Sequence, residues 1–77
     1  MLQKLKNLIE QGGDIEFSLN GRYYTILPWT EDGIVIGQQN ADDDMAFSSV
    51  EELIDGYLVD NKPLRSYVDQ IIITFAS

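Results

Sequence analysis

Residues 14–27 read DIEFSLNGRYYTIL, and the pattern of this stretch decides the fold class. Apolar and polar residues alternate up to Asn20-Gly21, and an Asn-Gly pair between two extended runs is a strong signal for a β-hairpin. A two-residue turn at Asn20-Gly21 sets Phe17 opposite Tyr24 on the face that we expect to enter the core. The sequence therefore predicts an antiparallel hairpin at the centre of the fold.

Further elements follow on both sides of this hairpin. Leucine and isoleucine recur at helical spacing over residues 2–9, and Gly12-Gly13 provides a stop, so a short first helix is expected. Pro28-Trp29 is expected to end the second strand, and residues 34–38 read as a third strand that completes a meander. Residues 39–45 are polar and acidic, which indicates a loop.

The C-terminal half predicts two helices and a last strand. Two overlapping capping boxes, Ser48 with Glu51 or Ser49 with Glu52, precede a helix. Its apolar face is expected to hold Val50, Leu53, Ile54, Tyr57 and Leu58. Pro63 suits the first position of a third helix, and residues 71–75 are β-branched and apolar, as in a strand.

These elements define the expected fold class. The chain is predicted to be a single α+β domain over residues 1–77, with a small antiparallel sheet. That sheet combines the three-stranded meander with a C-terminal strand, and two or three short helices pack on one face.

The composition bounds the possible chemistry. The 77 residues include no cysteine and no histidine, so the usual soft nucleophile and the usual general base are both missing. We therefore expect a protein that is not an enzyme and needs no cofactor. No apolar run reaches membrane-spanning length, and the lack of cysteine suits a reducing compartment, so a cytoplasmic location is expected.

The net charge of −8 is concentrated in one part of the sequence. Residues 31–60 carry nine acidic residues and no lysine or arginine. This block argues against direct binding of nucleic acid or of an anionic membrane, and it favours a basic protein partner or a cation. Excess charge that serves only solubility is the alternative interpretation.

A calcium loop is one candidate use of these acids. Residues 40–51 place oxygen donors at the spacing of a twelve-residue loop: Asn40, Asp42, Asp44, the Ala46 carbonyl, Ser48 and Glu51. Met45, however, stands where the sharp turn needs glycine. A solvated acidic loop before a capped helix accounts for the same residues, so no metal ligand is assigned.

Exposed aromatic residues are the second candidate for a binding site. Tyr23 and Trp29, with Leu27, fall on or near the sheet face opposite the predicted core, and such side chains commonly anchor protein interfaces. The competing interpretation is that a helix covers this face, or that Pro28 turns Trp29 back into the core.

The hairpin around Asn20-Gly21, together with the sequence FSSVEELIDGYLVDNKPL at residues 47–64, resembles small uncharacterised proteins of phages and prophages of Gram-positive bacteria. Members of that group pair a strand–Asn-Gly–strand hairpin with a Phe-Ser-x-x-Glu-Leu helix. This chain departs from the pattern at Asn61, where glycine is common. The resemblance implies a phage-type accessory protein that acts inside a bacterial cell, and it implies no catalytic residue.

The preferred hypothesis is a phage-encoded inhibitor that mimics nucleic acid and blocks the basic groove of a host or defence protein. Its expected partner-binding residues are Asp42, Asp43, Asp44, Glu51, Glu52, Asp55, Tyr23 and Trp29. The alternatives are a structural or assembly accessory protein that binds through the aromatic sheet face, and a weak calcium-binding module. Homo-oligomerisation stays open.

Overall fold

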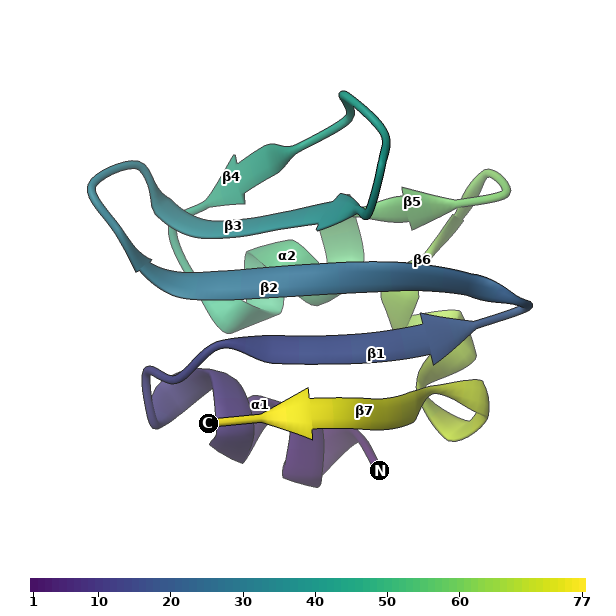
Figure 1. Cartoon of the computed structure of the whole chain (residues 1–77), viewed down its shortest axis with the longest axis horizontal. Helices are drawn as coiled ribbons and strands as arrows, with labels where there is room; N and C mark the ends of the chain where they lie inside the picture. Colours follow the sequence, from purple (N-terminus) through teal and green to yellow (C-terminus); the bar gives the residue numbers. More distant parts are fainter.

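The computed structural model describes residues 1–77, and the predicted hairpin lies at the centre of its sheet (Figure 1). Strand β1 (Ile15–Leu19) pairs with β2 (Arg22–Thr30), and Phe17 lies opposite Tyr24 as expected. Asn20 and Gly21 both adopt positive φ, at 53° and 77°. These angles match the two-residue turn that favours the twist of a hairpin, so the register is confirmed.

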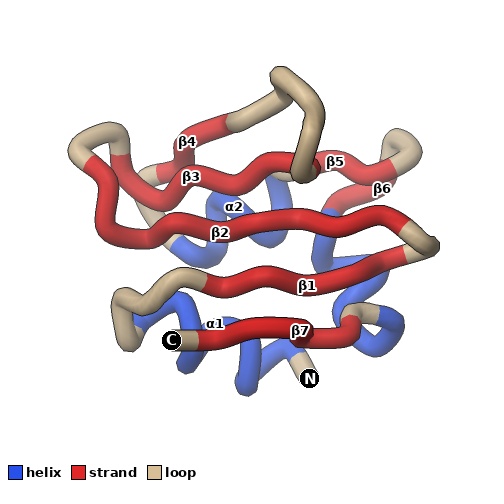
Figure 2. Tube along the Cα trace, viewed as in Figure 1, coloured by secondary structure: helices blue, strands red, loops and turns tan.

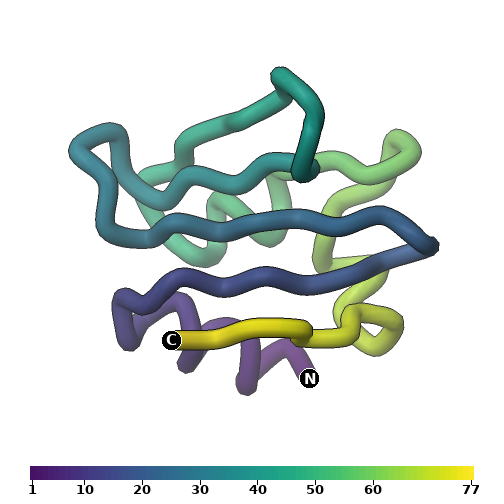
Figure 3. Tube along the Cα trace, viewed as in Figure 1, coloured from purple at the N-terminus to yellow at the C-terminus, as the bar shows by residue number.

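The sheet has five strands in the order β4-β3-β2-β1-β7, all paired antiparallel. Strands β3 (Gly33–Gln38) and β4 (Met45–Phe47) extend it on one side, and β7 (Ile72–Ala76) pairs with β1 on the other. The α+β fold class is confirmed, with one strand, β4, beyond the four expected. In Figure 3 the yellow β7 lies beside the early β1, although about 55 residues separate them in sequence.

Strand β2 continues through Pro28, contrary to the expectation that Pro28-Trp29 ends it. The pairing with β3 is interrupted between Leu27 and Thr30, where the register shifts. Proline has no N–H to donate, and such an irregularity is a position where a strand tolerates it. Strand β2 is therefore interrupted at Pro28-Trp29 but does not end there.

Three helical segments cover one face of the sheet: α1 (Leu2–Glu10), α2 (Val50–Gly56) and the 3₁₀ helix η1 (Leu64–Gln70) (Figure 2). Between them and the sheet lies a core of 15 buried residues, which includes Leu5 of α1, Leu53 and Ile54 of α2 and Leu64 of η1. None of these helices is long and apolar enough to cross a membrane. Helices on one face are as the sequence predicts, but the other face has no helical layer.

Helix α2 begins at the second of the two predicted capping boxes. The backbone N–H of Glu52 donates to Ser49 Oγ (3.2 Å), and Glu52 Oε2 accepts from the backbone N–H of Ser48 (3.3 Å). The first bond satisfies an amide group that a helix start leaves without a partner, and the second ties the residue before the N-cap to the first turn.

The end of α2 corrects one expectation, because the helix stops at Gly56 and Leu58 does not belong to its apolar face. Leu58 lies instead in a short hairpin of β5 (Leu58–Val59) and β6 (Lys62–Pro63), and its side chain is exposed. Asp60 and Asn61 form its turn with positive φ, a conformation that Asp and Asn tolerate better than most residues. The segment after Pro63 is a 3₁₀ helix, where the sequence predicted an α-helix.

Candidate protein-interaction surface

The face of the sheet that turns away from the helices is uncovered (Figure 2). We call it the open face and define it by the strand positions that alternate with the core residues, together with Asp14, which precedes β1. It consists of Asp14, Glu16, Ser18, Tyr23, Thr25, Leu27, Trp29, Val35, Gly37, Ala46, Ile72 and Phe75.

The open face is unusually apolar for a surface in contact with water. Exposed fractions are 56% for Tyr23, 63% for Trp29, 64% for Ile72 and 48% for Phe75. These four are the majority of the seven large hydrophobic residues that the whole chain leaves exposed. A solvated sheet face normally carries polar residues, and gathered aromatic and aliphatic side chains are typical of interfaces.

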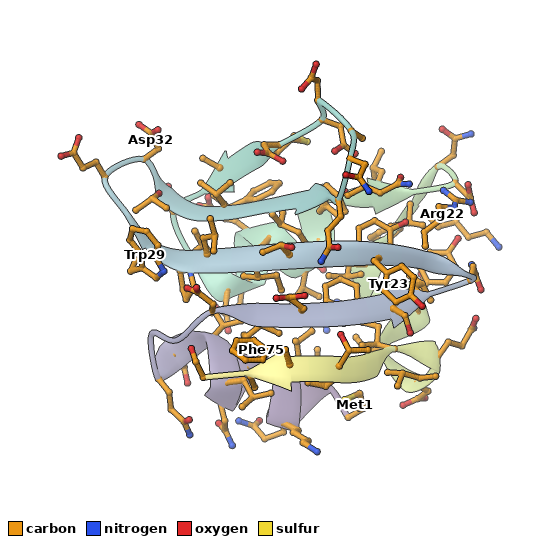
Figure 4. The ribbon with its side chains drawn as sticks, viewed as in Figure 1. Met1, Arg22, Tyr23, Trp29, Asp32 and Phe75 are labelled. Atoms are coloured by element: carbon orange, nitrogen blue, oxygen red, sulfur yellow. The ribbon has the colours of Figure 1, made fainter.

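Tyr23 and Trp29 therefore lie where the hairpin register placed them, and the interpretation that a helix or Pro28 buries them is wrong. The three helical segments all pack on the opposite face of the sheet, where they share the buried core with Phe17 and Tyr24. Figure 4 shows Trp29 at one end of the sheet, Tyr23 toward the other end, and Phe75 between them along the strand direction.

Trp29 is held in place on this face by Asp14. Its indole Nε1–H donates a hydrogen bond to Asp14 Oδ1, across the start of β1. Asp14 is itself fixed by the chain end, since its backbone N–H donates to Ser77 Oγ (2.9 Å) and its carbonyl accepts from the N–H of Ser77 (3.0 Å). The exposed indole is thus oriented by a polar contact.

A small polar group occupies the middle of the open face. Gln39 Nε2 lies 3.2 Å from Glu16 Oε1 and 3.1 Å from Thr25 Oγ1, so its amide crosses β2 to reach β1. No motif in the sequence marks Glu16, Gln39, Ile72 or Phe75 as binding residues. Glu16 is visible in the alternation of the hairpin, but the face on which Ile72 and Phe75 lie depends on how β7 pairs.

The acidic loop between β3 and β4 holds Asp42, Asp43 and Asp44. Asp43 is engaged on both oxygens: Oδ1 accepts from the backbone N–H of Gln38 (3.0 Å) and Oδ2 from the hydroxyl of Tyr57 (3.3 Å). Burial of Tyr57, and next the Asp43 charge, raise the pKa of its hydroxyl well above the usual range. The loop is therefore fastened to Tyr57, the residue that follows α2.

Gly37 explains why Asp44 lies close to the sheet. A Cβ at Gly37 would collide with the Asp44 side chain, and its distance to the Asp44 Cα would be 3.1 Å. Gly37 therefore marks a close approach of the β3–β4 loop to strand β3, as a glycine within a strand often does.

The acids of α2 are occupied by contacts within the protein. Glu51 pairs with Lys6 of α1 (3.4 Å) and Asp55 with Arg65 of η1 (2.7 Å), while Glu52 caps the helix. The Arg65 hydrogen bond lowers the pKa of Asp55. Of the six carboxylates expected to face a partner, only Asp42 and Asp44 make no hydrogen bond or ion pair.

The segment expected to wrap a calcium ion is partly a strand. Met45 to Phe47 form β4, in which Met45 lies opposite Ile36 and Phe47 opposite Ile34. An extended, paired strand does not curl its oxygen donors around a point, as a twelve-residue calcium loop must.

Comparison with protein-family models, curated proteins and solved structures gave no match for this chain. The resemblance to phage and prophage proteins stays a prediction. Interpretation of function therefore rests on the open face and its charges.

Proposed function

We propose that this chain is a non-catalytic binding module that holds a basic protein partner on the open face of its sheet. The observation that supports this proposal is the cluster of exposed Tyr23, Trp29, Ile72 and Phe75 on a sheet face without a helical layer. In protein interfaces a few such side chains supply most of the binding energy.

The distribution of charge indicates the kind of partner. Four of the five cationic residues belong to the helical layer or to the β5–β6 hairpin: Lys4 and Lys6 in α1, Arg65 in η1 and Lys62 in β6. The fifth, Arg22, lies opposite the buried Leu19 and pairs with Asp60 (3.1 Å), away from the open face. The charged residues at the open face are Asp14, Glu16 and, over Gly37 opposite Thr25, Asp44; all three are acidic, and Figure 4 shows Asp32 at the end where Trp29 lies.

This charge argues against a second copy of the chain as the occupant. Two open faces pressed together would bring Glu16 and Asp14 of one copy near the same acids of the other, within a pair of net charge −16 if each copy carries −8. Like charges buried in an interface cost several kcal/mol, whereas a basic surface meets the same acids favourably.

The extents of the molecule set an upper limit on the size of the open face. The molecule measures 28 × 25 Å in the two directions of Figure 1, in which the sheet is seen face on. The area covered is at most roughly 700 Å², close to the roughly 800 Å² that each partner contributes to a standard interface. A partner that covered most of the sheet would thus approach the size of a standard interface.

Nucleic-acid mimicry by the acid block stays a prediction of the sequence. Asp43, Glu51, Glu52 and Asp55 already hold partners within the protein, so we assign the acids of the loop to steering a basic partner toward the sheet. A phage-type setting inside a bacterial cell remains part of the proposal and rests on the resemblance alone.

The test begins with capture of partners from a bacterial lysate on the immobilised protein, at low and at high salt. The dissociation constant of each purified partner is then measured by surface plasmon resonance. We expect Tyr23→Ala combined with Trp29→Ala to raise it by at least about tenfold, chiefly through faster dissociation.

Leu58→Ala is the matched control, because Leu58 is equally exposed but belongs to the β5–β6 hairpin. It should leave the dissociation constant within about twofold of the parent's. The proposal fails if the variant with Tyr23→Ala and Trp29→Ala binds like the parent while Asp42→Asn with Asp44→Asn abolishes binding. The acid block would then be the binding site.

A further inference from the structure

Glu16 lies on the open face between two neighbouring strands. It is the second residue of β1 and lies directly opposite Thr25 on β2 and Phe75 on β7. Other acids of the molecule lie at chain turns, on helices or at the edge of the sheet. A partner that covers the face must therefore accommodate this carboxylate.

The carboxylate is held in position by Gln39. The side-chain amide of Gln39 donates to Glu16 Oε1 (3.2 Å), and the backbone N–H of Gln39 is itself anchored on the carbonyl of Tyr23 (2.8 Å). An ionised carboxylate has about four acceptor sites, so one amide leaves Oε2 and part of Oε1 free. Glu16 is thus oriented but incompletely satisfied.

Glu16 is partly buried, yet no cation of the chain reaches it. The three ion pairs of the structure involve other acids, Glu51, Asp55 and Asp60. When a partner removes the remaining water, an unpaired carboxylate costs far more than a paired one. Stable docking on this face consequently calls for a cation from the partner.

The neighbours of Glu16 favour a flat cation. Phe75 lies directly opposite, and Tyr23 lies opposite Ser18, the next residue of β1 on the same face. Direct and diagonal neighbours in a sheet are typically about 5 and 7–8 Å apart, so a group over Glu16 can reach both rings. Guanidinium stacks on aromatic rings and binds carboxylates with two parallel hydrogen bonds, whereas an ammonium is a strongly hydrated point charge.

We infer that Glu16, with Phe75 and Tyr23, forms an arginine-binding site on the open face, and that the basic partner inserts an arginine there. This inference rests on the proposed function and adds the chemistry of the central contact. Lysine satisfies the charge of Glu16 but not its ring neighbours, so arginine is the preferred occupant.

The test uses a small probe and the free protein. The peptide Ac-Leu-Arg-Leu-NH₂ is titrated into ¹⁵N-labelled protein at about 150 mM salt, an ionic strength that screens distant charges. We expect saturable shifts of the amide signals of Glu16, Thr25, Gln39 and Phe75. The peptide with neutral citrulline in place of arginine should bind about tenfold more weakly, and the lysine peptide should be intermediate.

The matched variants are Glu16→Gln and Glu10→Gln, the latter an exposed acid of α1. Glu16→Gln should reduce the preference for arginine over citrulline from about tenfold to nearly none, while Glu10→Gln preserves it. Thermal melting of both variants checks that the fold is retained. Absence of saturable shifts, shifts centred on residues 40–44, or an arginine preference that survives Glu16→Gln would each overturn the inference.

Two sets of variants separate an arginine site at Glu16 from binding by the open face as a whole. If Tyr23→Ala with Trp29→Ala weakens a captured partner but Glu16→Gln does not, the face binds that partner without an arginine at Glu16. If neither change affects any partner, the open face is not the binding surface.

Discussion

The indole N–H of Trp29 donates a hydrogen bond to the carboxylate of Asp14, the residue that precedes β1. Trp29, one of the most exposed large hydrophobic residues of the molecule, is therefore oriented before any partner arrives. A fixed aromatic side chain loses less conformational freedom on binding than a free one, which favours its use as an anchor.

Removal of this contact should mobilise the indole. For Asp14→Ala we expect a lower fluorescence anisotropy of Trp29 and stronger quenching by acrylamide, with a loss of unfolding free energy of at most about 1.5 kcal/mol. Trp29 is the only tryptophan, so its signal needs no assignment. Asp32→Ala, an acid at the same end of the sheet, serves as control, and an equal change in both variants would contradict the role of Asp14.

Two leucines five residues apart should differ sharply in their contribution to stability. Leu53 is fully buried between α2 and the sheet, whereas Leu58 is 57% exposed. Leu53→Ala should lower the unfolding free energy by about 2–5 kcal/mol, out of roughly 4–11 kcal/mol for a chain of this length. Leu58→Ala should change it by less than about 0.5 kcal/mol. Urea denaturation measures both, and similar values would mean that Leu53 does not belong to the core.

Neighbouring aspartates of the β3–β4 loop should also behave differently. Asp43 accepts hydrogen bonds from Gln38 and Tyr57, so Asp43→Ala is expected to cost about 1 kcal/mol of unfolding free energy. Asp42 makes no such contact, and Asp42→Ala should be neutral or slightly stabilising, because it relieves repulsion in an acidic loop. Thermal and urea denaturation measure both variants. Equal effects of Asp43→Ala and Asp42→Ala would show that Asp43 does not fasten the loop.

Stability should fall in alkaline solution because of Tyr57. Burial and the Asp43 charge raise the pKa of Tyr57 above its unfolded value of about 10, so above that pH the unfolded state loses a proton that the folded state keeps. The stabilisation is complete below pH about 10 and is lost at up to about 1.4 kcal/mol per pH unit as the pH rises toward the folded pKa.

Tyr57→Phe isolates this effect. The variant should be less stable than the parent near neutral pH, since it lacks the bond to Asp43, but the difference should shrink and then reverse above pH about 10. Denaturation at several pH values between 7 and 11 measures the difference. A constant difference over this range would exclude a proton linked to Tyr57.

Local sequence determined a large part of this protein. The Asn20-Gly21 turn fixes the register of β1 and β2, and with it the core position of Tyr24 and the outward position of Tyr23. The apolar spacing of α1 and the capping residues of α2 likewise predict both helices. Such features depend on the conformations of adjacent residues and on periodicity, which the sequence displays directly.

Tertiary structure decided what the sequence left open. Whether a helix would cover Trp29, and whether Phe75 and Ile72 would join it, depends on where segments distant in sequence pack. Placement of β7 beside β1, with a register shift between Glu16 and Phe17, brings Phe75 opposite Glu16. Pairings of this kind are selected by burial of apolar faces in the whole molecule, a property of the packed core that no short stretch contains. Local periodicity thus placed Glu16 and Tyr23 on one face of a hairpin, and only the packing of the complete chain made that face an open surface.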